Sequence, residues 1–189
     1  MNTSNKNELR QKYRALRDSF GEEFIEKVSI SICENLTKCQ EFQTADTILL
    51  YYPIKSEISP LPLFEICLKM GKNVAFPVCQ VENSTLIFKK VNTLNSLSNS
   101  IFGLLEPQDD CKIVTPTENT LCLVPALVFS CDGYRLGYGK GFYDRFLADF
   151  RGTSIGFSYS SLVLDTIPHD KHDIKLDMII TESEVLKFA

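Results

Sequence analysis

The sequence predicts an α/β fold with a mostly parallel sheet, and three consecutive segments carry this prediction. Residues 47–52 are a β-branched and aromatic run that Pro53 stops. Residues 59–70 have a helical pattern that a glycine ends, and residues 73–77 form a second strand. Two strands joined by one helix form a βαβ unit, whose strands are parallel. Ligands of such sheets bind beyond the carboxyl ends of the strands, which makes residues 52–57 a candidate wall of a site.

Two amphipathic helices are expected ahead of this unit. Apolar residues recur on one helical face over residues 6–18, behind a capping-box pair formed by Asn5 and Glu8. Ser19 and Glu22 repeat the capping spacing before a second apolar stripe. The chain is therefore expected to open with a helical hairpin.

The second half continues the alternation of strands and helices. No internal repeat is present, and 189 residues with 44% hydrophobic content fit a single domain, 1–189, with a sizeable core. The expected segments are strands at 86–91, 101–105, 121–127, 153–157 and 178–181, a helix at 142–149, a polar linker at 92–100 and a turn-rich loop at 109–119.

Composition limits the classes of partner and compartment. The net charge of −4 argues against nucleic acid and anionic membranes as partners. The polar first twelve residues and the absence of a long apolar run argue against a signal peptide or a membrane span. Seven cysteines, an odd number without a CxxC pair, are typical of reduced structural thiols. A cytoplasmic protein that binds small molecules, with a monomer as the simplest assembly, is expected.

Residues 135–141, Arg-Leu-Gly-Tyr-Gly-Lys-Gly, are the segment with alternating glycines around a cation. A strand that leads into such a loop ahead of a helix presents backbone N–H groups to an anion, and Arg135 and Lys140 add positive charge. The spacing matches neither a Walker A loop nor the dinucleotide fingerprint, so a tight turn is the alternative. Asp144 favours a phosphate site, because a carboxylate beside phosphate is repulsive unless a divalent cation lies between them.

Cations on the first helix are candidates for the same phosphates. Lys6 and Arg10 are four residues apart and share one side of the helix, which Arg14 and Arg17 continue. The alternative is a solvated helix face. The functional interpretation requires the glycine loop to lie nearby.

His169 and His172 are the two histidines of the chain, and they lie in a polar segment. Three aspartates accompany them: Asp170, Asp173 and Asp177. Zinc is improbable, because neither thiols nor further histidines are near in sequence. Oxygen ligation of Mg²⁺ by one of these aspartates together with Asp144 stays open, and an exposed polar loop is the alternative.

Two tyrosines are candidates for stacking on a flat heterocycle. Tyr52 and Tyr143 each lie beside a position that is already expected to contact a ligand. Most other aromatic residues of a domain of this size belong to the core.

Five sequence blocks, taken in order, carry a resemblance to a known family. They are Lys6-x-x-x-Arg10; Tyr52 with Glu57; Phe102-Gly-Leu-Leu-Glu-Pro107; Val124-Pro125-Ala126 leading to RLGYGKGFYDRFL at residues 135–147; and His172-Asp173 with Asp177 and Thr181. Together they resemble the 5-formyltetrahydrofolate cyclo-ligase family over nearly the full chain. The block at 135–147 is the strongest match.

The resemblance implies an open, three-layer α/β fold of the ribose-phosphate-isomerase and CoA-transferase type. It also implies closure of 5-formyltetrahydrofolate to 5,10-methenyltetrahydrofolate with ATP as co-substrate and Mg²⁺ as cofactor. By position, the implied ATP-binding residues are Lys6, Arg10, Arg135, Leu136, Gly137, Tyr138, Gly139, Lys140, Gly141, Phe142 and Tyr143. The implied folate-binding residues are Tyr52, Glu57, Tyr138 and Tyr143, the metal ligands are Asp144 and Asp173, and the catalytic cations are Lys6, Arg10 and Lys140.

One position departs from the family pattern, since relatives often carry arginine where this chain has Tyr138. A cationic contact is then either absent or supplied by Lys140. Two other functions stay open at this point. A sugar-phosphate isomerase on the same fold would use Glu57 as a base without ATP, and a non-catalytic folate or nucleotide sensor would leave ATP intact.

Overall fold

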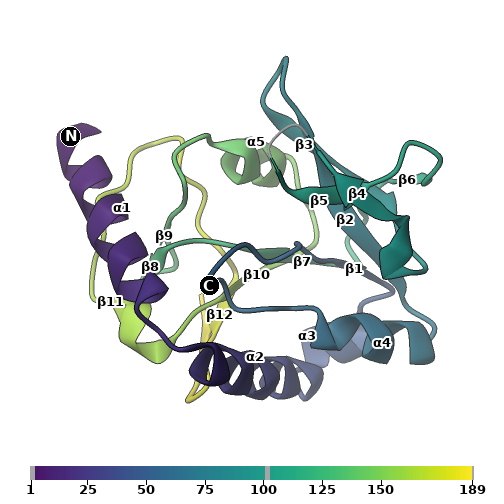
Figure 1. The fold of residues 1–189 in the computed structure, drawn as a ribbon, viewed down its shortest axis with the longest axis horizontal. Coiled ribbons are helices and arrows are strands. Elements are labelled where there is room, and N and C mark those ends of the chain that lie inside the picture. Colours follow the sequence, from purple (N-terminus) through teal and green to yellow (C-terminus); the bar gives the residue numbers. More distant parts are fainter. Residues whose placement is uncertain (1–2, 101–102, 189) are drawn as a thin grey trace.

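An eight-stranded sheet runs through the centre of the molecule in the computed structural model, which describes residues 3–100 and 103–188 (Figure 1). In spatial order its strands are β13 (Val185–Lys187), β12 (Met178–Ile180), β10 (Thr153–Phe157), β7 (Thr120–Val124), β1 (Thr47–Leu49), β2 (Asn73–Gln80), β3 (Thr85–Lys90) and β6 (Ile113–Val114). The five strands from β12 to β2 are parallel neighbours, and the pairs at both margins are antiparallel. The expected mostly parallel sheet is confirmed.

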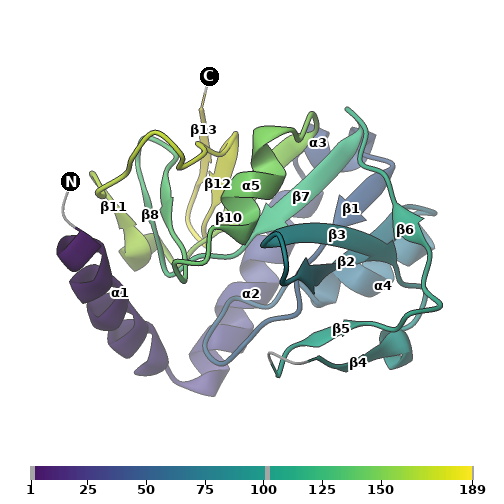
Figure 2. The same cartoon turned by 90° about the horizontal axis from the view of Figure 1, so that it is seen from above.

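Helices and two smaller sheets lie around this sheet. The α-helices are α1 (Thr3–Asp18), α2 (Glu22–Thr37), α3 (Gln40–Thr44), α4 (Pro62–Lys69) and α5 (Phe142–Ala148), and the 3₁₀ turns are η1 (Leu94–Ser96) and η2 (Ser160–Leu162). The small sheets pair β11 (Val163–Leu164) with β8 (Val128–Ser130) and β9 (Arg135–Leu136), and β4 (Leu97–Asn99) with β5 (Leu105–Pro107). In Figures 1 and 2, α2, α3 and α4 cover one face of the sheet, and α5 lies on the other face. The arrangement has three layers.

Alternate residues of the central strands pack into two separate cores. Ile48 packs on the side of α2 to α4, whereas its neighbour Leu49 packs with Leu147 of α5. Both side chains are fully buried, each worth about 1.5–3 kcal/mol relative to exposure. Because both faces are covered, the strands are apolar throughout and show no alternation in sequence.

The helix starts differ from the expected capping boxes. α1 begins at Thr3, so Asn5 lies inside the helix and does not precede it. α2 begins after Gly21, which makes no side-chain cap. The Ser19 hydroxyl donates instead to the carbonyl of Leu16 at 2.6 Å, so it closes the end of α1. The two helices follow one another but do not lie side by side in either view (Figures 1 and 2).

Short strands account for most of the other differences. The expected strand 121–127 ends at Val124 as β7, because Pro125 has no backbone N–H to continue the ladder, and β8 begins at Val128, beyond the expected end. The expected linker 92–100 contains η1 and β4, the expected loop 109–119 contains β6, and β13 follows the strand that was expected to be last. Of the expected strand 101–105, residues 101–102 lie outside the described part, and β5 begins at Leu105.

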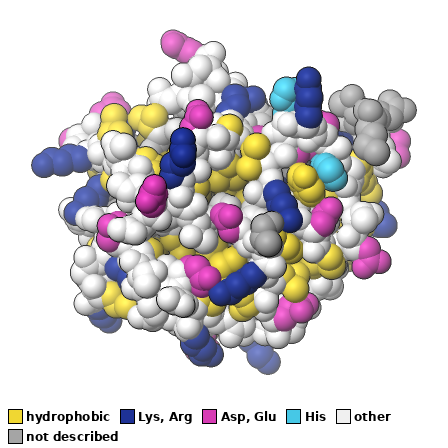
Figure 3. Space-filling view, turned by 180° about the vertical axis from the view of Figure 1, so that it is seen from behind, with side chains coloured by type: hydrophobic (Ala, Val, Ile, Leu, Met, Phe, Trp, Pro, Cys, Tyr) yellow, Lys and Arg dark blue, Asp and Glu magenta, His cyan; other side chains and the backbone are white. Residues whose placement is uncertain are grey.

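Two surface properties complete the description. Among the described residues, no helix is long and apolar enough to cross a membrane. The face shown in Figure 3 carries basic and acidic side chains interspersed with one another.

Candidate active site

A cavity of about 370 Å³ lies where the chain leaves β1 and β7, at the carboxyl side of the parallel strands. This is the position that the βαβ unit predicted. Its lining contains most of the residues that the sequence selected: Tyr52, Glu57, Arg135, Gly137, Tyr138, Gly139, Lys140, Gly141, Phe142, Tyr143, Asp144 and Asp173.

Three other candidates are placed differently. Leu136 is buried in β9, where it pairs with Val128, so its side chain belongs to the core. Lys6 and Arg10 are not part of the cavity lining, but they reach its surrounding loops from α1. The first helix and the glycine loop are therefore neighbours, as the phosphate-binding hypothesis requires.

Backbone conformation requires two of the loop glycines. Gly139 has φ +92° and Gly141 has φ +69°, in the region that side chains with a Cβ rarely adopt. A Cβ on Gly139 would also lie 3.0 Å from the guanidinium carbon of Arg10. Because the end of the Arg10 side chain can shift, the positive φ is the stronger reason for glycine at that position.

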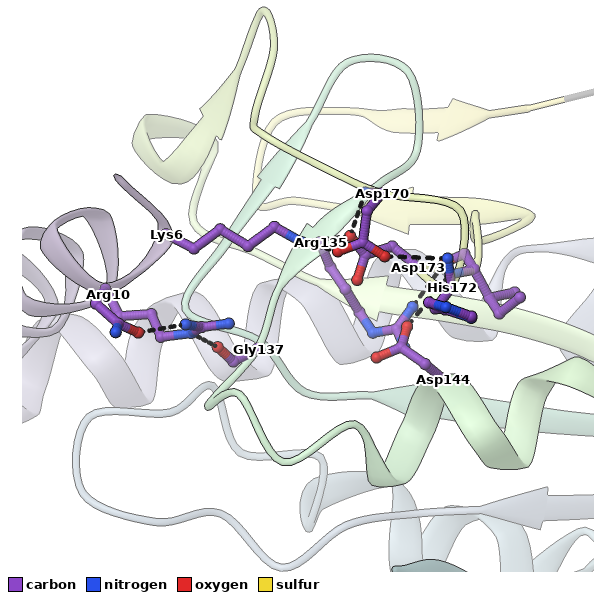
Figure 4. Close-up of polar contacts among 10 residues, drawn as sticks. Lys6, Arg10, Arg135, Gly137, Asp144, Asp170, His172 and Asp173 are labelled. Atoms are coloured by element: carbon purple, nitrogen blue, oxygen red, sulfur yellow. Dashed lines mark hydrogen bonds and ion pairs between the residues drawn. The ribbon is translucent and has the colours of Figure 1, made fainter. Parts of the chain in front are cut away.

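Arg10 and Lys6 connect α1 to the two loops beside the cavity (Figure 4). Arg10 Nε donates to the carbonyl of Gly137 at 2.9 Å. Lys6 Nζ contacts Asp173 Oδ2 at 2.6 Å and Asp170 Oδ2 at 3.0 Å. Burial alone would lower the pKa of Lys6, but the hydrogen bonds to both carboxylates outweigh it and raise the pKa. Lys6 is charged and is held against an acidic loop.

Arg135 forms an ion pair with Asp144. Its Nη2 lies 2.7 Å from Asp144 Oδ1, and its Nη1 donates to the carbonyl of Ile174 at 2.8 Å. The backbone N–H of Ile174 donates to the same carboxylate oxygen at 3.2 Å. Burial lowers the pKa of Arg135, and the charge of Asp144 opposes this effect. The pair orients Asp144 at the edge of the cavity.

Asp144 and Asp173 are the aspartates that line the cavity. Among the described residues, no group of three or more histidine, cysteine or acidic side chains could hold a metal. Mg²⁺ usually takes one or two carboxylates and completes its shell with phosphate and water oxygens. Two carboxylates in the lining of this cavity therefore fit Mg²⁺ that arrives with a nucleotide.

The remaining acidic candidates of that segment face elsewhere. Asp170 is exposed, and its pKa is lowered mainly by the backbone N–H of His172 and then by Lys6. Asp177 Oδ2 accepts from the backbone N–H and the hydroxyl of Ser154, at 2.7 and 2.6 Å. Asp177 therefore holds strands together, away from the cavity lining.

Glu57 forms the inner wall of the cavity. Its side chain is nearly inaccessible, since the residue is 5% exposed, and burial raises its pKa. The hydroxyl of Tyr138 donates to Glu57 Oε1 at 2.6 Å, and the N–H of Ile54 donates to Oε2 at 3.0 Å. Arg17 Nη2 lies 4.0 Å from Oε1. These three groups favour the ionised form and oppose the effect of burial.

Tyr143 places an unsatisfied hydroxyl at the cavity. The hydroxyl is buried and has no hydrogen-bond partner among the described residues. Burial raises the pKa of Tyr143, so the group keeps its proton. Buried polar groups are nearly always hydrogen-bonded, so an exception at a cavity wall leaves a hydroxyl that a water molecule or a ligand can bind.

A comparison with known families decides between the alternatives. The model of the 5-formyltetrahydrofolate cyclo-ligase family matches residues 2–182, which is most of the chain. The chain belongs to the 5-formyltetrahydrofolate cyclo-ligase family. The expected family and its activity are therefore confirmed: the protein is a ligase that forms 5,10-methenyltetrahydrofolate from 5-formyltetrahydrofolate.

Three relatives each cover more than nine tenths of this chain. The "Probable 5-formyltetrahydrofolate cyclo-ligase" of Schizosaccharomyces pombe is 26% identical over 96% of this chain and 97% of its own. The NMR structure of Aquifex aeolicus 5,10-methenyltetrahydrofolate synthetase is 36% identical, with a TM-score of 0.84 over 96% of this chain and 92% of that one. The Mycoplasma pneumoniae 5,10-methenyltetrahydrofolate synthetase is 26% identical, with a TM-score of 0.76 over 94% and 98%.

The cyclo-ligase site contains residues that sequence reasoning did not select. Cys79 and Glu106 line the cavity, and the N–H of Cys79 donates to Glu106 Oε1 at 3.2 Å. Arg17, for which a solvated helix face was the alternative, is 3% exposed and contacts Tyr138. Its position four residues after Tyr13, on the apolar face of α1, is the sequence signal for this burial.

Proposed function

We propose that the cavity binds ATP and 5-formyltetrahydrofolate together and transfers the γ-phosphoryl group to the formyl oxygen. One observation carries this proposal: a single cavity has an anion-binding glycine loop on one side and a buried carboxylate with an unpartnered tyrosine hydroxyl on the other. A charged co-substrate and a flat heterocycle with polar edges fit these two sides. Products are 5,10-methenyltetrahydrofolate, ADP and phosphate.

The nucleotide side is formed by the loop at 137–141 and the cations around it. The backbone of this loop and Lys140 face the cavity, while Lys6 and Arg10 approach from α1. The present partners of Lys6 are two carboxylates, and those of Arg10 are a carbonyl and the side chain of Asn7. Phosphate oxygens can replace them. Lys6, Arg10 and Lys140 would then neutralise charge on the transferred phosphoryl group.

Asp144 and Asp173 would hold Mg²⁺ on this side of the cavity. When bound, Mg²⁺ supplies charge neutralisation of the triphosphate. The ion pair with Arg135 keeps the Asp144 carboxylate oriented at the cavity. Asp173 would exchange its contact with Lys6 when the nucleotide binds.

The folate side is formed by Tyr52, Glu57, Tyr138 and Tyr143. An ionised carboxylate accepts N–H groups in a bidentate manner, which suits the N–H edge of a reduced pterin. The bound folate would give the buried hydroxyl of Tyr143 the hydrogen-bond partner that it lacks, and Tyr52 would stack on the pterin ring. These contacts would place the formyl oxygen toward the glycine loop.

The chemistry requires no protein nucleophile. The formyl group on nitrogen-5 is an amide-like carbonyl whose oxygen is a poor leaving group. Phosphoryl transfer from ATP to that oxygen gives an imidate phosphate and ADP. Attack by nitrogen-10 closes the ring, its proton is lost, and phosphate departs with the C–O bonding pair. Positioning and charge stabilisation supply the catalysis.

We also propose that the enzyme works in the cytoplasm as a monomer with these small molecules as its partners. All seven cysteines are free, as expected in a reducing compartment. Gel filtration of the purified protein tests the monomer directly. Elution as a dimer would contradict this part of the proposal.

The activity test is spectroscopic. Protein, Mg²⁺, ATP and 5-formyltetrahydrofolate are mixed, and the near-ultraviolet absorbance band of the methenyl product is followed. The band is expected only when ATP and Mg²⁺ are both present, with one ADP formed for each methenyl group. A folded protein that gives no band, or gives it without ATP, would contradict the mechanism.

A further inference from the structure

A buried cation lies behind the folate side of the cavity. Arg17, in the last turn of α1, is 3% exposed. Its guanidinium donates to the hydroxyl of Ser56 at 3.2 Å, to the carbonyl of Ala126 at 2.9 Å and to the hydroxyl of Tyr138 at 2.6 Å. Burying a charge is costly unless it is paired and hydrogen-bonded. The nearest carboxylate is that of Glu57, at 4.0 Å.

The hydroxyl of Tyr138 joins the cation to this carboxylate. A phenol has one proton, and the hydroxyl of Tyr138 gives it to Glu57 Oε1 at 2.6 Å. The hydroxyl oxygen of Tyr138 in turn accepts a hydrogen bond from Arg17 Nη2 at 2.6 Å. Because Arg17 occupies the acceptor side, the proton of Tyr138 can point only toward Glu57. The three groups form a directed chain from cation to carboxylate.

We propose that Arg17 is a positioning residue for folate binding, which acts through Tyr138 to hold the Glu57 carboxyl group in place at the cavity. The inference deepens the proposed function, on which its folate-binding part rests. Arg17 does not line the cavity itself. Its effect on the substrate is therefore indirect.

The other titratable groups around Glu57 cannot replace this cation. The titratable side chains that face Glu57 are Tyr51, Tyr138, Tyr143 and Tyr159. The hydroxyls of Tyr51 and Tyr159 donate to the carbonyls of Ile58 and Ser56, at 2.6 and 2.9 Å. They therefore give Glu57 no hydrogen bond.

Loss of the cation changes the protonation of Glu57 in a defined direction. Burial favours the neutral carboxyl, while Tyr138, Arg17 and the N–H of Ile54 favour the carboxylate. Without Arg17, Glu57 takes up a proton at higher pH. A protonated carboxyl no longer accepts two N–H bonds, so the folate binds less tightly as the pH falls.

The test compares three variants by steady-state kinetics over a range of pH. Arg17→Met removes the charge, Arg17→Lys keeps the charge without the three divergent bonds, and Tyr138→Phe removes the bridge. Arg17→Met is expected to raise KM for 5-formyltetrahydrofolate between about tenfold and a hundredfold, as for the loss of one hydrogen bond to a charged group. KM for ATP is expected to change less than about twofold, since no phosphate contact is lost.

The pH profile separates positioning from a structural role. The acid limb of kcat/KM is expected to move to higher pH in Arg17→Met, and Arg17→Lys is expected to bring it back toward the wild type. Lys89→Met is the matched control, because Lys89 is also a buried cation, bonded to the carbonyl of Gln108 and not part of the cavity lining. That variant is expected to lose stability but to keep both KM values and the acid limb.

A second readout does not depend on activity. Titration of the Glu57 carboxyl by carbon-13 NMR in the folded protein is expected to give a higher pKa in Arg17→Met and in Tyr138→Phe than in the wild type. Tyr138→Phe keeps the inference testable if Arg17→Met does not fold. An unchanged Glu57 pKa in the folded variants, or an equal rise of both KM values, would overturn the inference. A wild-type protein without methenyl formation would instead overturn the proposed function, while the NMR titration still tests the role of Arg17.

Discussion

The two sides of the cavity differ in how their charges are paired. On the nucleotide side, Lys6 and Asp173 are both partly exposed and contact each other across two separate elements. On the folate side, Glu57 and Arg17 are 5% and 3% exposed, and a tyrosine hydroxyl joins them. Partly exposed partners can be exchanged for phosphate at little cost, whereas buried partners cannot. We therefore expect the proposed folate side to be preformed and the proposed nucleotide side to rearrange around its ligand.

Replacement of Lys140 should have the largest effect on turnover and almost none on stability. Lys140→Ala is expected to lower kcat roughly a hundredfold, or about 3 kcal/mol in the barrier, because one group that stabilises the transferring charge is lost. Lys140 is exposed, so the free energy of unfolding should stay within about 0.5 kcal/mol of the wild type. The exposed Lys69 of α4 offers the control Lys69→Ala, with normal turnover. Unchanged kcat in Lys140→Ala would remove that residue from the mechanism.

Neutralising Glu57 should affect binding and stability together. Glu57→Gln leaves the buried charge of Arg17 without its carboxylate and is expected to cost about 2–3 kcal/mol of unfolding free energy. KM for 5-formyltetrahydrofolate should rise about tenfold, with KM for ATP unchanged. Urea denaturation and steady-state kinetics measure the two effects. Normal folate binding by Glu57→Gln would contradict the claim that Glu57 is part of a preformed folate side.

Replacement of Lys6 should weaken ATP binding and have little effect on stability. Lys6→Ala is expected to raise KM for ATP about tenfold, as for loss of one charge-assisted contact. Its partly exposed ion pairs with Asp170 and Asp173 should contribute less than about 1 kcal/mol to folding. Equal loss of stability in Lys6→Ala and Glu57→Gln would remove the difference between the two sides.

The Tyr143 hydroxyl offers a finer test of the folate side. Tyr143→Phe removes a buried hydroxyl that has no partner among the described residues, so stability should be unchanged or slightly higher. KM for 5-formyltetrahydrofolate should rise by about threefold to tenfold if the ligand supplies the partner. Loss of stability without any change in KM would indicate that the hydroxyl serves the fold.

The smallest expected effect is a pH dependence of stability. The pKa of Glu57 is raised in the folded protein, so the folded state binds its proton more tightly than the unfolded state does. The contribution of Glu57 to stability is therefore full below the unfolded pKa and is lost as the pH rises through the raised, folded pKa. Between the unfolded and the folded pKa of Glu57, the wild type should lose stability relative to Glu57→Gln as the pH rises. Denaturation at a series of pH values measures the difference, and a relative gain would contradict the sign.

Sequence patterns predicted the parts of the fold that depend on local chemistry. The strand expected at 153–157 has the same bounds as β10, and the helix after the glycine loop begins at Phe142 as expected. The capping box expected at the start of the second helix was wrong, because the Ser19 hydroxyl bonds to the helix before it and not to the helix after it. β6 and β13 have only two and three residues, and each forms through pairing with a neighbouring strand, which the local sequence of so short a segment does not indicate.

In the site, too, local sequence patterns identified some residues, whereas others depend on contacts between distant parts of the chain. The glycine loop, Lys140 and the aspartates were predicted, because their residue types carry the chemistry directly. The spacing of Arg17 after Tyr13 places it on the buried face of α1, but its partners Ala126 and Tyr138 lie more than a hundred residues later in the chain, so no local pattern identifies them. Leu136 was expected to bind ATP, yet its side chain alternates into the core, because adjacent residues of β9 point to opposite faces.

The most direct test is a crystal structure with a non-hydrolysable ATP analogue, Mg²⁺ and 5-formyltetrahydrofolate. We predict the triphosphate on the loop at 137–141, with Lys6 and Arg10 moved from Asp173 and Gly137 onto phosphate oxygens. Glu57, Tyr138 and Arg17 are predicted to keep their present hydrogen bonds while the pterin binds beside them. A triphosphate bound elsewhere, with this loop empty, would contradict the account.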